Sequence, residues 1–273
     1  MMNKTPVEQK IYYALYIAMV MCMIGHGAFG IITKQIWCNY FGVFGIGHNM
    51  SYKLMPVVGS IDILMGIIML FHPNRAIAIW LVGWGFATAS LRPLSGEPFA
   101  ELIERAGNFG APLSLLLLCG LEKNIKTWFK KIRPEEIHFT EKNVPRLEVS
   151  LKIIVFLLLA GHGWLNFIQK KSIVAQYENM GFSNPMDIAS MIGVFEILAA
   201  FGLLIKPVTP LILFLFIWKM ASELFYPHWE IFEWIERGGS YGTLLALYFY
   251  YQAHKSNNFL YTLKERRWNI NLF

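Results

Sequence analysis

The sequence predicts an all-α integral membrane protein of eight transmembrane helices, arranged as two tandem four-helix bundles in parallel orientation. The chain is 55% hydrophobic and only 15% charged, which is too apolar for an ordinary soluble domain. Apolar runs recur at about the 20 residues that a helix needs to cross a bilayer. The second half of the chain also repeats the first. A multi-pass membrane protein satisfies all three observations.

The repeat is clearest in two segments, FAELIERAGNFG at 99–110 and FEWIERGGSYG at 232–242. Identical residues stand at the same spacing in both. The matched pairs are Glu101 with Glu233, Glu104 with Glu236, Arg105 with Arg237, Gly107 with Gly239 and Gly110 with Gly242. Further matches are Gly25-His26-Gly27 with Gly161-His162-Gly163, Asp62 with Glu196, and Pro73 with Pro207. Fixed-period similarity of this kind indicates a tandem duplication.

Each half contains four apolar runs, and each run predicts one spanning helix. The runs are 11–33, 54–72, 75–91, 104–121, 149–168, 187–205, 208–226 and 237–253. The first run is long and lacks a small-residue cleavage site, so we expect it to remain as a helix. The predicted organisation is a first repeat at 1–121, a basic linker at 122–148, a second repeat at 149–254 and a basic C-terminal tail at 255–273.

Charge distribution predicts the orientation in the membrane. An even number of helices in each half puts both termini and the linker on one side, and that side collects most Lys and Arg residues. The positive-inside rule makes this side cytoplasmic, and we expect the protein in a bacterial inner (plasma) membrane. The basic balance is then a signal for topology and lipid headgroups. No nucleic-acid partner is expected, because the sequence offers no soluble basic face.

Histidines and acids occupy matching intramembrane positions in the two halves. His26 and His162 lie in the outer parts of the first and fifth predicted helices. Asp62 and Glu196 lie about 13 Å from the outer ends of the second and sixth, at 1.5 Å per residue. A carboxylate at this depth costs ~2.5 kcal/mol or more and is usually paired or functional. We therefore predict His26 with Asp62, and His162 with Glu196, as catalytic proton-transfer pairs; the alternative is a structural clamp between helices.

Glutamates and arginines open the fourth and eighth predicted helices. Acids in a first turn are favoured by the helix dipole, which explains part of the pattern but leaves the arginines unexplained. We expect a buried Glu–Arg network that lines a cavity rather than a solvated helix end. The predicted substrate-binding residues are Glu101, Glu104, Arg105, Glu223, Glu233, Glu236 and Arg237.

Other cofactor motifs are weak. Cys22, Cys38 and Cys119 form no CxxC pair, so neither a dithiol centre nor a disulfide scaffold is expected. No metal site is predicted. A b-type haem held by His26 and His162 is a less favoured variant, because any duplication of a His-bearing helix produces such a pair.

The four-helix unit resembles the DoxX/DoxD superfamily of membrane proteins. The resemblance rests on His-Gly near the outer end of the first helix, a short amphipathic stretch, and Gly-x-x-Glu-Ile-Leu with a closing Pro in the second. His162-Gly163, Gly193, Glu196 and Leu198 match this pattern, whereas the first repeat has Asp62 in place of Glu. The resemblance implies four helices per repeat and, for some relatives, membership in quinone-linked complexes such as thiosulfate:quinone oxidoreductase.

The leading hypothesis is thus a quinone-linked redox subunit, served by a soluble or membrane redox partner. Protons would pass through the His–carboxylate pairs, and Arg105 and Arg237 would polarise a carbonyl or an anion. Two alternatives remain open: a small-solute transporter or receptor that uses the same polar cavity, and a non-catalytic assembly subunit. The oligomeric state is not predicted.

Overall fold

The computed structural model describes residues 5–226 and 231–255, and within these ranges the chain is helical apart from loops and one isolated bridge between Asn74 and Lys131. The all-α prediction is confirmed for this part of the chain. Of the predicted tail at 255–273, all but the first residue lies outside the described residues.

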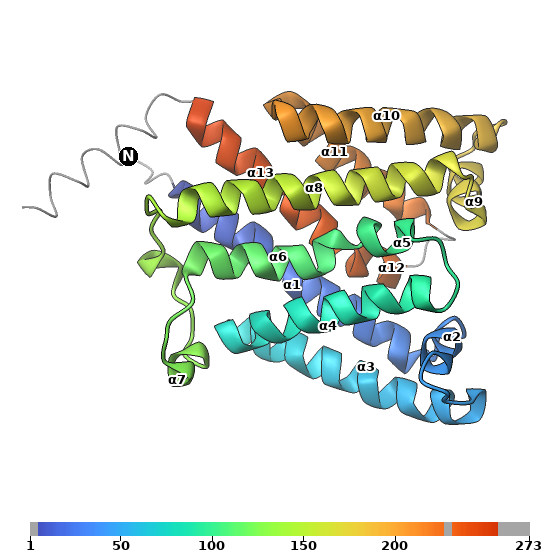
Figure 1. Cartoon of the computed structure of the whole chain (residues 1–273), viewed down its shortest axis with the longest axis horizontal. Coiled ribbons are helices and arrows are strands. Elements are labelled where there is room, and N and C mark those ends of the chain that lie inside the picture. Colours follow the sequence, from blue (N-terminus) through green and yellow to red (C-terminus); the bar gives the residue numbers. More distant parts are fainter. Residues whose placement is uncertain (1–4, 227–230, 256–273) are drawn as a thin grey trace, which may run out of the picture.

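The helices follow the same order in the two halves (Figure 1). The first half contains α1 (Val7–Ile31), α2 (Trp37–Gly42), α3 (His48–Phe71), α4 (Arg75–Leu94), α5 (Ala100–Glu104) and α6 (Ala106–Cys119). The linker carries α7 (Ile125–Trp128) and the 3₁₀ turn η1 (Pro134–Glu136). The second half contains α8 (Asn143–Phe167), α9 (Lys171–Asn179), α10 (Pro185–Ile205), α11 (Thr209–Ser222), η2 (Glu223–Phe225), α12 (Ile231–Glu236) and α13 (Gly238–Lys255).

Local backbone conformation repeats along with the helix order. Thr33 and Gln169, just beyond α1 and α8, are the non-glycine residues with positive φ in the described chain, at 52° and 55°. Gly45 and Gly181 have positive φ before α3 and α10. A non-glycine residue in the left-handed region is uncommon, so its recurrence at matching places reflects a common local architecture.

Four helices are long and apolar enough to cross a membrane: α1, α3, α4 and α10. Helices α8 and α9 count as a fifth span only if taken together across a bend of 86°. Helix α6 is apolar but has only 14 residues. By length and composition the described helices thus give four or five of the eight predicted spans.

A short separate helix lies at or before the start of two of the predicted helices. The run at 104–121 is split at Arg105, which ends α5 and precedes α6, and the run at 237–253 is preceded by the separate α12. In the first case Nη1 of Arg105 turns back to the carbonyl oxygen of Glu101 at 3.3 Å. Glu97 lies in the loop before α5. Contacts of the buried Arg105 side chain thus stabilise the break between α5 and α6.

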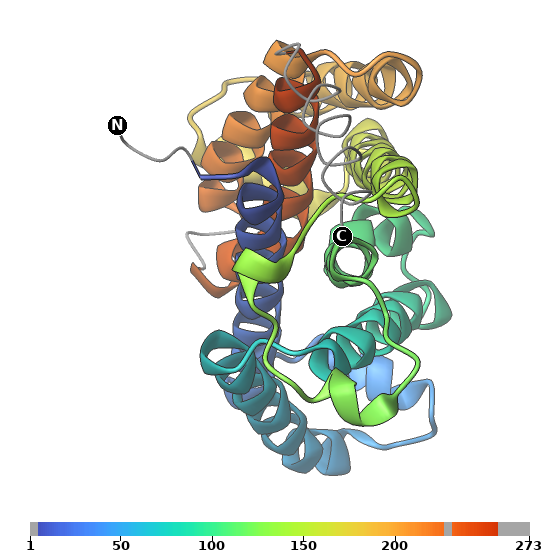
Figure 2. The same cartoon turned by 90° about the vertical axis from the view of Figure 1, so that its left-hand side faces the viewer.

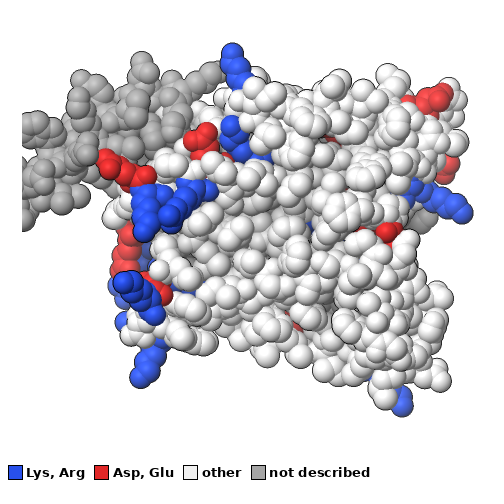
Figure 3. Space-filling view, in the orientation of Figure 1, with Lys and Arg blue, Asp and Glu red and all other residues white. Residues whose placement is uncertain are grey.

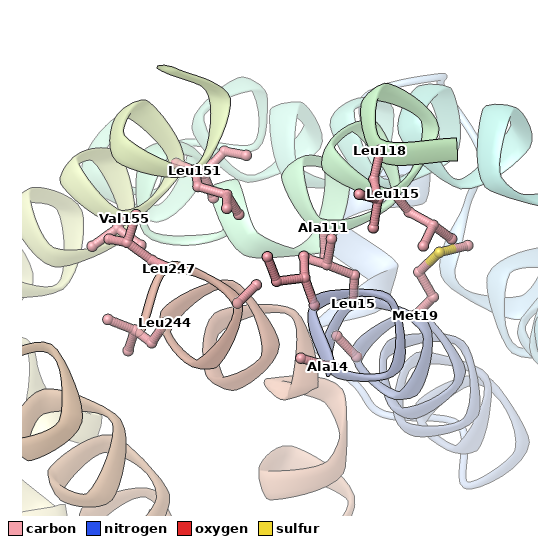
Figure 4. Packing of buried hydrophobic residues seen from close by; sticks show 14 of the residues in the cluster. Ala14, Leu15, Met19, Ala111, Leu115, Leu118, Leu151, Val155, Leu244 and Leu247 are labelled. Carbon is pink, nitrogen blue, oxygen red and sulfur yellow. The ribbon is translucent and has the colours of Figure 1, made fainter. Parts of the chain in front are cut away.

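The two halves share the main hydrophobic core, and two smaller clusters lie outside it. Helices α1, α6, α8 and α13 lie at the centre, with α3 and α4 along one edge and α10 and α11 along the other (Figures 1 and 2). Figure 4 shows side chains from all four central helices in contact around Leu15, Leu115, Val155 and Leu247. All four side chains are fully or almost fully buried.

Glycines let the helices of the two halves approach closely. A Cβ added at Gly107 of α6 would lie 2.6 Å from the backbone carbon of Gly239 of α13, and Gly239 meets Gly107 in the same way. Gly27 and Gly163 similarly face backbone atoms of α3 and α10. Small residues at helix crossings permit such backbone contact. These crossings set the positions of the polar residues beside them.

Candidate functional site

Both predicted His–carboxylate pairs are in contact. Nδ1 of His26 lies 2.8 Å from Oδ2 of Asp62, and Nδ1 of His162 lies 2.5 Å from Oε2 of Glu196. The first pair links α1 to α3 and the second links α8 to α10, each beside a point where glycines let the two helices cross closely. With the carboxylate ionised, each imidazole donates its Nδ1 hydrogen, so Nε2 is the nitrogen left for other partners.

The two pairs differ in their surroundings. His162 and Glu196 are buried at 3% and 0% exposure, whereas the His26 side chain keeps 20% of its surface exposed. Asn166 packs onto the His162 pair with its Nδ2 at 2.9 Å from Nδ1, and it accepts a hydrogen bond from Tyr177 at 2.7 Å. The pair in the second half is therefore enclosed by protein.

The expected Glu–Arg network is buried and crosses the boundary between the halves. Glu104 accepts hydrogen bonds from Arg105 at 2.7 Å and from Arg237 of the other half. Oε2 of Glu223 lies 3.0 Å from Nε of Arg237, and Oε1 of Glu223 lies 3.6 Å from Nε2 of His162. All these charged groups have partners of opposite sign, as burial in a low-dielectric interior requires.

The remaining glutamates of the predicted set are also paired across the halves. Lys170 bonds to Glu101 and, at the equivalent place, Lys34 bonds to Glu233. Oε1 of Glu236 accepts a hydrogen bond from Nδ2 of Asn108 at 2.6 Å.

Cations control the ionisation of Glu101. Burial alone raises the pKa of this carboxyl, but Arg105, Lys170 and Arg92 around it have the larger combined effect, and its pKa lies below the usual value. Glu101 therefore carries a negative charge at neutral pH.

A cavity of about 170 Å³ lies beside the His26 pair. Its walls come from α1, α2, α3 and α4 and from the break between α5 and α6. They are mainly aromatic and apolar, and the polar lining residues are His26, Tyr40, Thr88, Arg92, Arg105, Asn108 and Glu236. A neighbouring space of about 10 Å³ touches both His26 and Asp62, which is close to the volume that one water molecule needs.

Two residues of the cavity wall carry a buried N–H group that has no acceptor in the described part of the chain. The groups are Nε1 of Trp84 and Nε of Arg105. An unsatisfied buried donor costs about 1–3 kcal/mol, so such groups are rare in native structures and call for an explanation.

The charges around the cavity are balanced by the protein itself. Nη1 of Arg92 lies 3.5 Å from both Glu97 and Glu101, and its guanidinium stands over the ring of Tyr40 at 5.3 Å. Tyr40 in turn donates to Glu97 at 2.6 Å, and burial raises the pKa of its hydroxyl. Arg105 is paired with Glu101 and Glu104. The balance favours a neutral ligand over an anion.

The second half has a buried ion pair at the positions equivalent to part of the cavity wall. Lys219 and Glu223 bond to each other at 2.8 Å and are 2% and 1% exposed. At the matching positions of α4 the first half has Ala87 and Leu91, which line its cavity. The two repeats thus differ in charge at two equivalent positions beside their histidines.

The structure groups the predicted residues into two unequal clusters. His26, Arg105 and Glu236 line the first-half cavity itself, and Asp62 supports His26 from behind. The others belong to the closed network of the second half or to the flanking pairs: Glu101, Glu104, His162, Glu196, Glu223, Glu233 and Arg237. Sequence reasoning missed Trp37, Trp84, Arg92 and Asn108. For Arg92 the sequence did contain a signal, because the alignment of the repeats places this arginine opposite Leu224, an apolar residue.

Comparisons with protein-family models, with curated proteins and with solved structures found no match.

Proposed function

We propose that this chain is a membrane protein that binds the ring of a quinone in the first-half cavity and delivers protons to it through His26 and Asp62. The observation that carries the proposal is an aromatic cavity beside the His26–Asp62 pair, two of whose lining residues, Trp84 and Arg105, carry N–H groups without an acceptor. A quinone presents two carbonyl oxygens on a flat apolar ring, which is the complement of that lining.

The proposal places the protein in a membrane. Four long apolar helices support it, as does the distribution of charge in Figure 3, where Lys and Arg gather mostly at the end that carries the linker and a broad uncharged band follows. We place all eight predicted helices in the bilayer, with both termini and the linker in the cytoplasm of a bacterial cell. The cavity then opens in the outer half of the membrane.

Cavity size favours a single ring. A protein cavity of roughly 150 Å³ accommodates benzene, and the first-half cavity has about 170 Å³. Trp37 lies against the His26 imidazole with ring centroids 4.8 Å apart, which adds a flat wall. A quinone ring fits this space, and its isoprenoid tail would leave toward the lipid.

Proton delivery follows from the His26–Asp62 contact. Asp62 holds the imidazole by its Nδ1 hydrogen and stabilises the imidazolium, so Nε2 can give a proton to a quinone oxygen and recover one afterwards. Reduction of a quinone to a quinol takes up two protons and two electrons. The protons come through this pair, and a partner redox protein supplies the electrons. The resemblance to DoxX/DoxD proteins supports the same assignment.

The buried cluster of the second half has a structural role in this proposal. Its described charged groups are paired with one another, among them Lys219 with Glu223 and Glu223 with Arg237.

Binding tests the proposal first. The full chain, purified in mild detergent, should carry quinone detectable by mass spectrometry and should bind a short-chain ubiquinone analogue in calorimetry. Replacing Trp84 by phenylalanine removes one unpartnered donor but keeps the aromatic wall, and it should weaken binding roughly 5- to 10-fold, about one hydrogen bond. A protein that binds no quinone would overturn the assignment.

Voltammetry of the protein on an electrode tests proton delivery, because the electrode replaces the natural electron donor. Asp62→Asn should slow quinone reduction by roughly 10²-fold while binding persists. Glu196→Gln is the matched variant in the second half and should leave the rate unchanged. The opposite ranking would move the proton pathway to the second half.

A further inference from the structure

A second, larger cavity lies at the opposite end of the molecule from the His26 site. It has a volume of about 870 Å³ and is formed between the linker, the end of α6 and the beginnings of α4 and α8. The linker crosses this end of the helices, away from α2, α5 and α9 (Figures 1 and 2). Nothing in the proposed quinone chemistry uses this cavity.

Cations outnumber acids in its lining. The basic lining residues are Arg75, Lys130, Lys131, Arg133, Lys142 and Arg146, and the acidic ones are Glu122 and Glu136. Both acids already have partners. Glu136 lies 3.2 Å from Nη1 of Arg133, and Glu122 lies 3.9 Å from Nη2 of Arg75.

Four cations therefore face the cavity without a carboxylate. Within the described ranges 5–226 and 231–255, no acid lies at ion-pair distance from Lys130, Lys131, Lys142 or Arg146. Like charges gathered around one space repel each other, and a bound anion would relieve this.

The linker is fixed to the helices, so the cavity is a built feature. Ile132, Ile137 and Phe139 are buried in the main core. The amide of Ile132 donates to the carbonyl oxygen of Pro73 at 2.7 Å, and Nδ2 of Asn143 donates to the carbonyl oxygen of Leu118 at 3.3 Å. These anchors hold the basic residues on both sides of the space.

The opposite wall is apolar and belongs to α6. It contains Leu113, Leu116 and Leu117, with Leu121 just beyond the helix, and Leu113 and Leu121 are exposed. A site with cations on one side and leucines on the other matches an amphiphilic anion. We infer that this cavity binds a phosphate-bearing anion, and that the anion is the headgroup of an anionic phospholipid whose acyl chain follows α6. The inference uses the membrane embedding proposed above but not the quinone site.

Lipid titration of the purified full chain tests this inference. Phosphatidylglycerol, added to the detergent, should bind in native mass spectrometry and raise the unfolding temperature, whereas phosphatidylcholine should do neither. Lys130→Gln combined with Lys131→Gln should weaken phosphatidylglycerol binding roughly 30-fold, because each basic residue contributes about a factor of five near an anionic headgroup.

The linker offers a matched control. Lys123→Gln combined with Lys126→Gln removes the same charge from linker positions outside the cavity lining and should leave binding within about twofold of the parent. Equal losses in the two double variants would overturn the site in favour of general surface charge. Should the first double variant fail to fold, Lys142→Gln with Arg146→Gln applies the same test from α8.

Inorganic phosphate distinguishes the two sources of the anion. If it protects the chain as well as phosphatidylglycerol does, and with the same dependence on Lys130 and Lys131, the lipid assignment is overturned. If it has no effect, the lipid assignment stands. Quinone binding at the other end should not change in any of these variants, so loss of the lipid site and loss of the quinone site are separate results.

Discussion

Replacing Gly107 by alanine should destabilise the entire fold, because α6 crosses α13 at this residue. A Cβ here would lie 2.6 Å from the backbone carbon of Gly239 and equally close to the amide nitrogen of Ser240. Backbone atoms cannot move aside as a flexible side chain can, so the helices must separate. Overpacking of this kind costs about 1–3 kcal/mol. The better helix propensity of alanine returns only ~1 kcal/mol or less.

Gly83→Ala is the matched control, since Gly83 lies inside α4 and no atom stands within 4 Å of its added Cβ. That variant should gain about 0.5–1 kcal/mol from helix propensity alone. Thermal unfolding in detergent, followed by tryptophan fluorescence, should therefore move in opposite directions for the two variants. The reasoning is refuted if Gly107→Ala is as stable as Gly83→Ala. A loss of quinone binding should accompany the destabilisation, because the cavity lies beside this crossing.

Three further predictions follow from the charged residues and from the repeat. Glu104→Gln should cost about 3–5 kcal/mol, because it leaves two buried arginines short of a partner, whereas Glu136→Gln in an exposed pair should cost less than about 1 kcal/mol in the same unfolding assay. Ala87→Lys combined with Leu91→Glu copies the second-half ion pair into the first half, and calorimetry should show no quinone binding. The pKa of Glu101 is lowered in the folded protein, so its ionised carboxylate stabilises the fold at pH values above the usual carboxyl pKa. This stabilisation should disappear as the pH falls through the folded-state pKa. Glu101→Gln should therefore make the free energy of unfolding less dependent on pH in that range.

Much of the site could be predicted from sequence because the same residue types recur at equivalent positions in the two repeats. An acid or a histidine that recurs at the same depth in both halves has a physical role, and this identified the partners of His26 and His162 before any geometry. Burial of the Glu–Arg network followed from the same reasoning, since helix dipoles account for acids but not for Arg105 and Arg237.

The cavity could not be predicted, because its walls are side chains from helices that are far apart in the sequence. Ala87 and Leu91 are unremarkable in an apolar helix, and only the fold places them in the cavity wall. The predicted helix starts at 104 and 237 lie within two residues of those of α6 and α13, but the short helices α5 and α12 before them were not predicted as separate elements.

The exchange of contacts between the halves bears on how this protein arose. Gly25 lies against the backbone of Glu236, and Gly161 lies against that of Glu104, so the fourth helix of each half completes the site of the other. A lone repeat would leave its glycine face and its buried acids uncovered. Two copies of a single repeat could make the same contacts as a symmetric homodimer, with the two-fold axis between the glycines equivalent to Gly107 and Gly239. Fusion of the two copies into one chain allows residues at equivalent positions to differ, as Ala87 and Lys219 do.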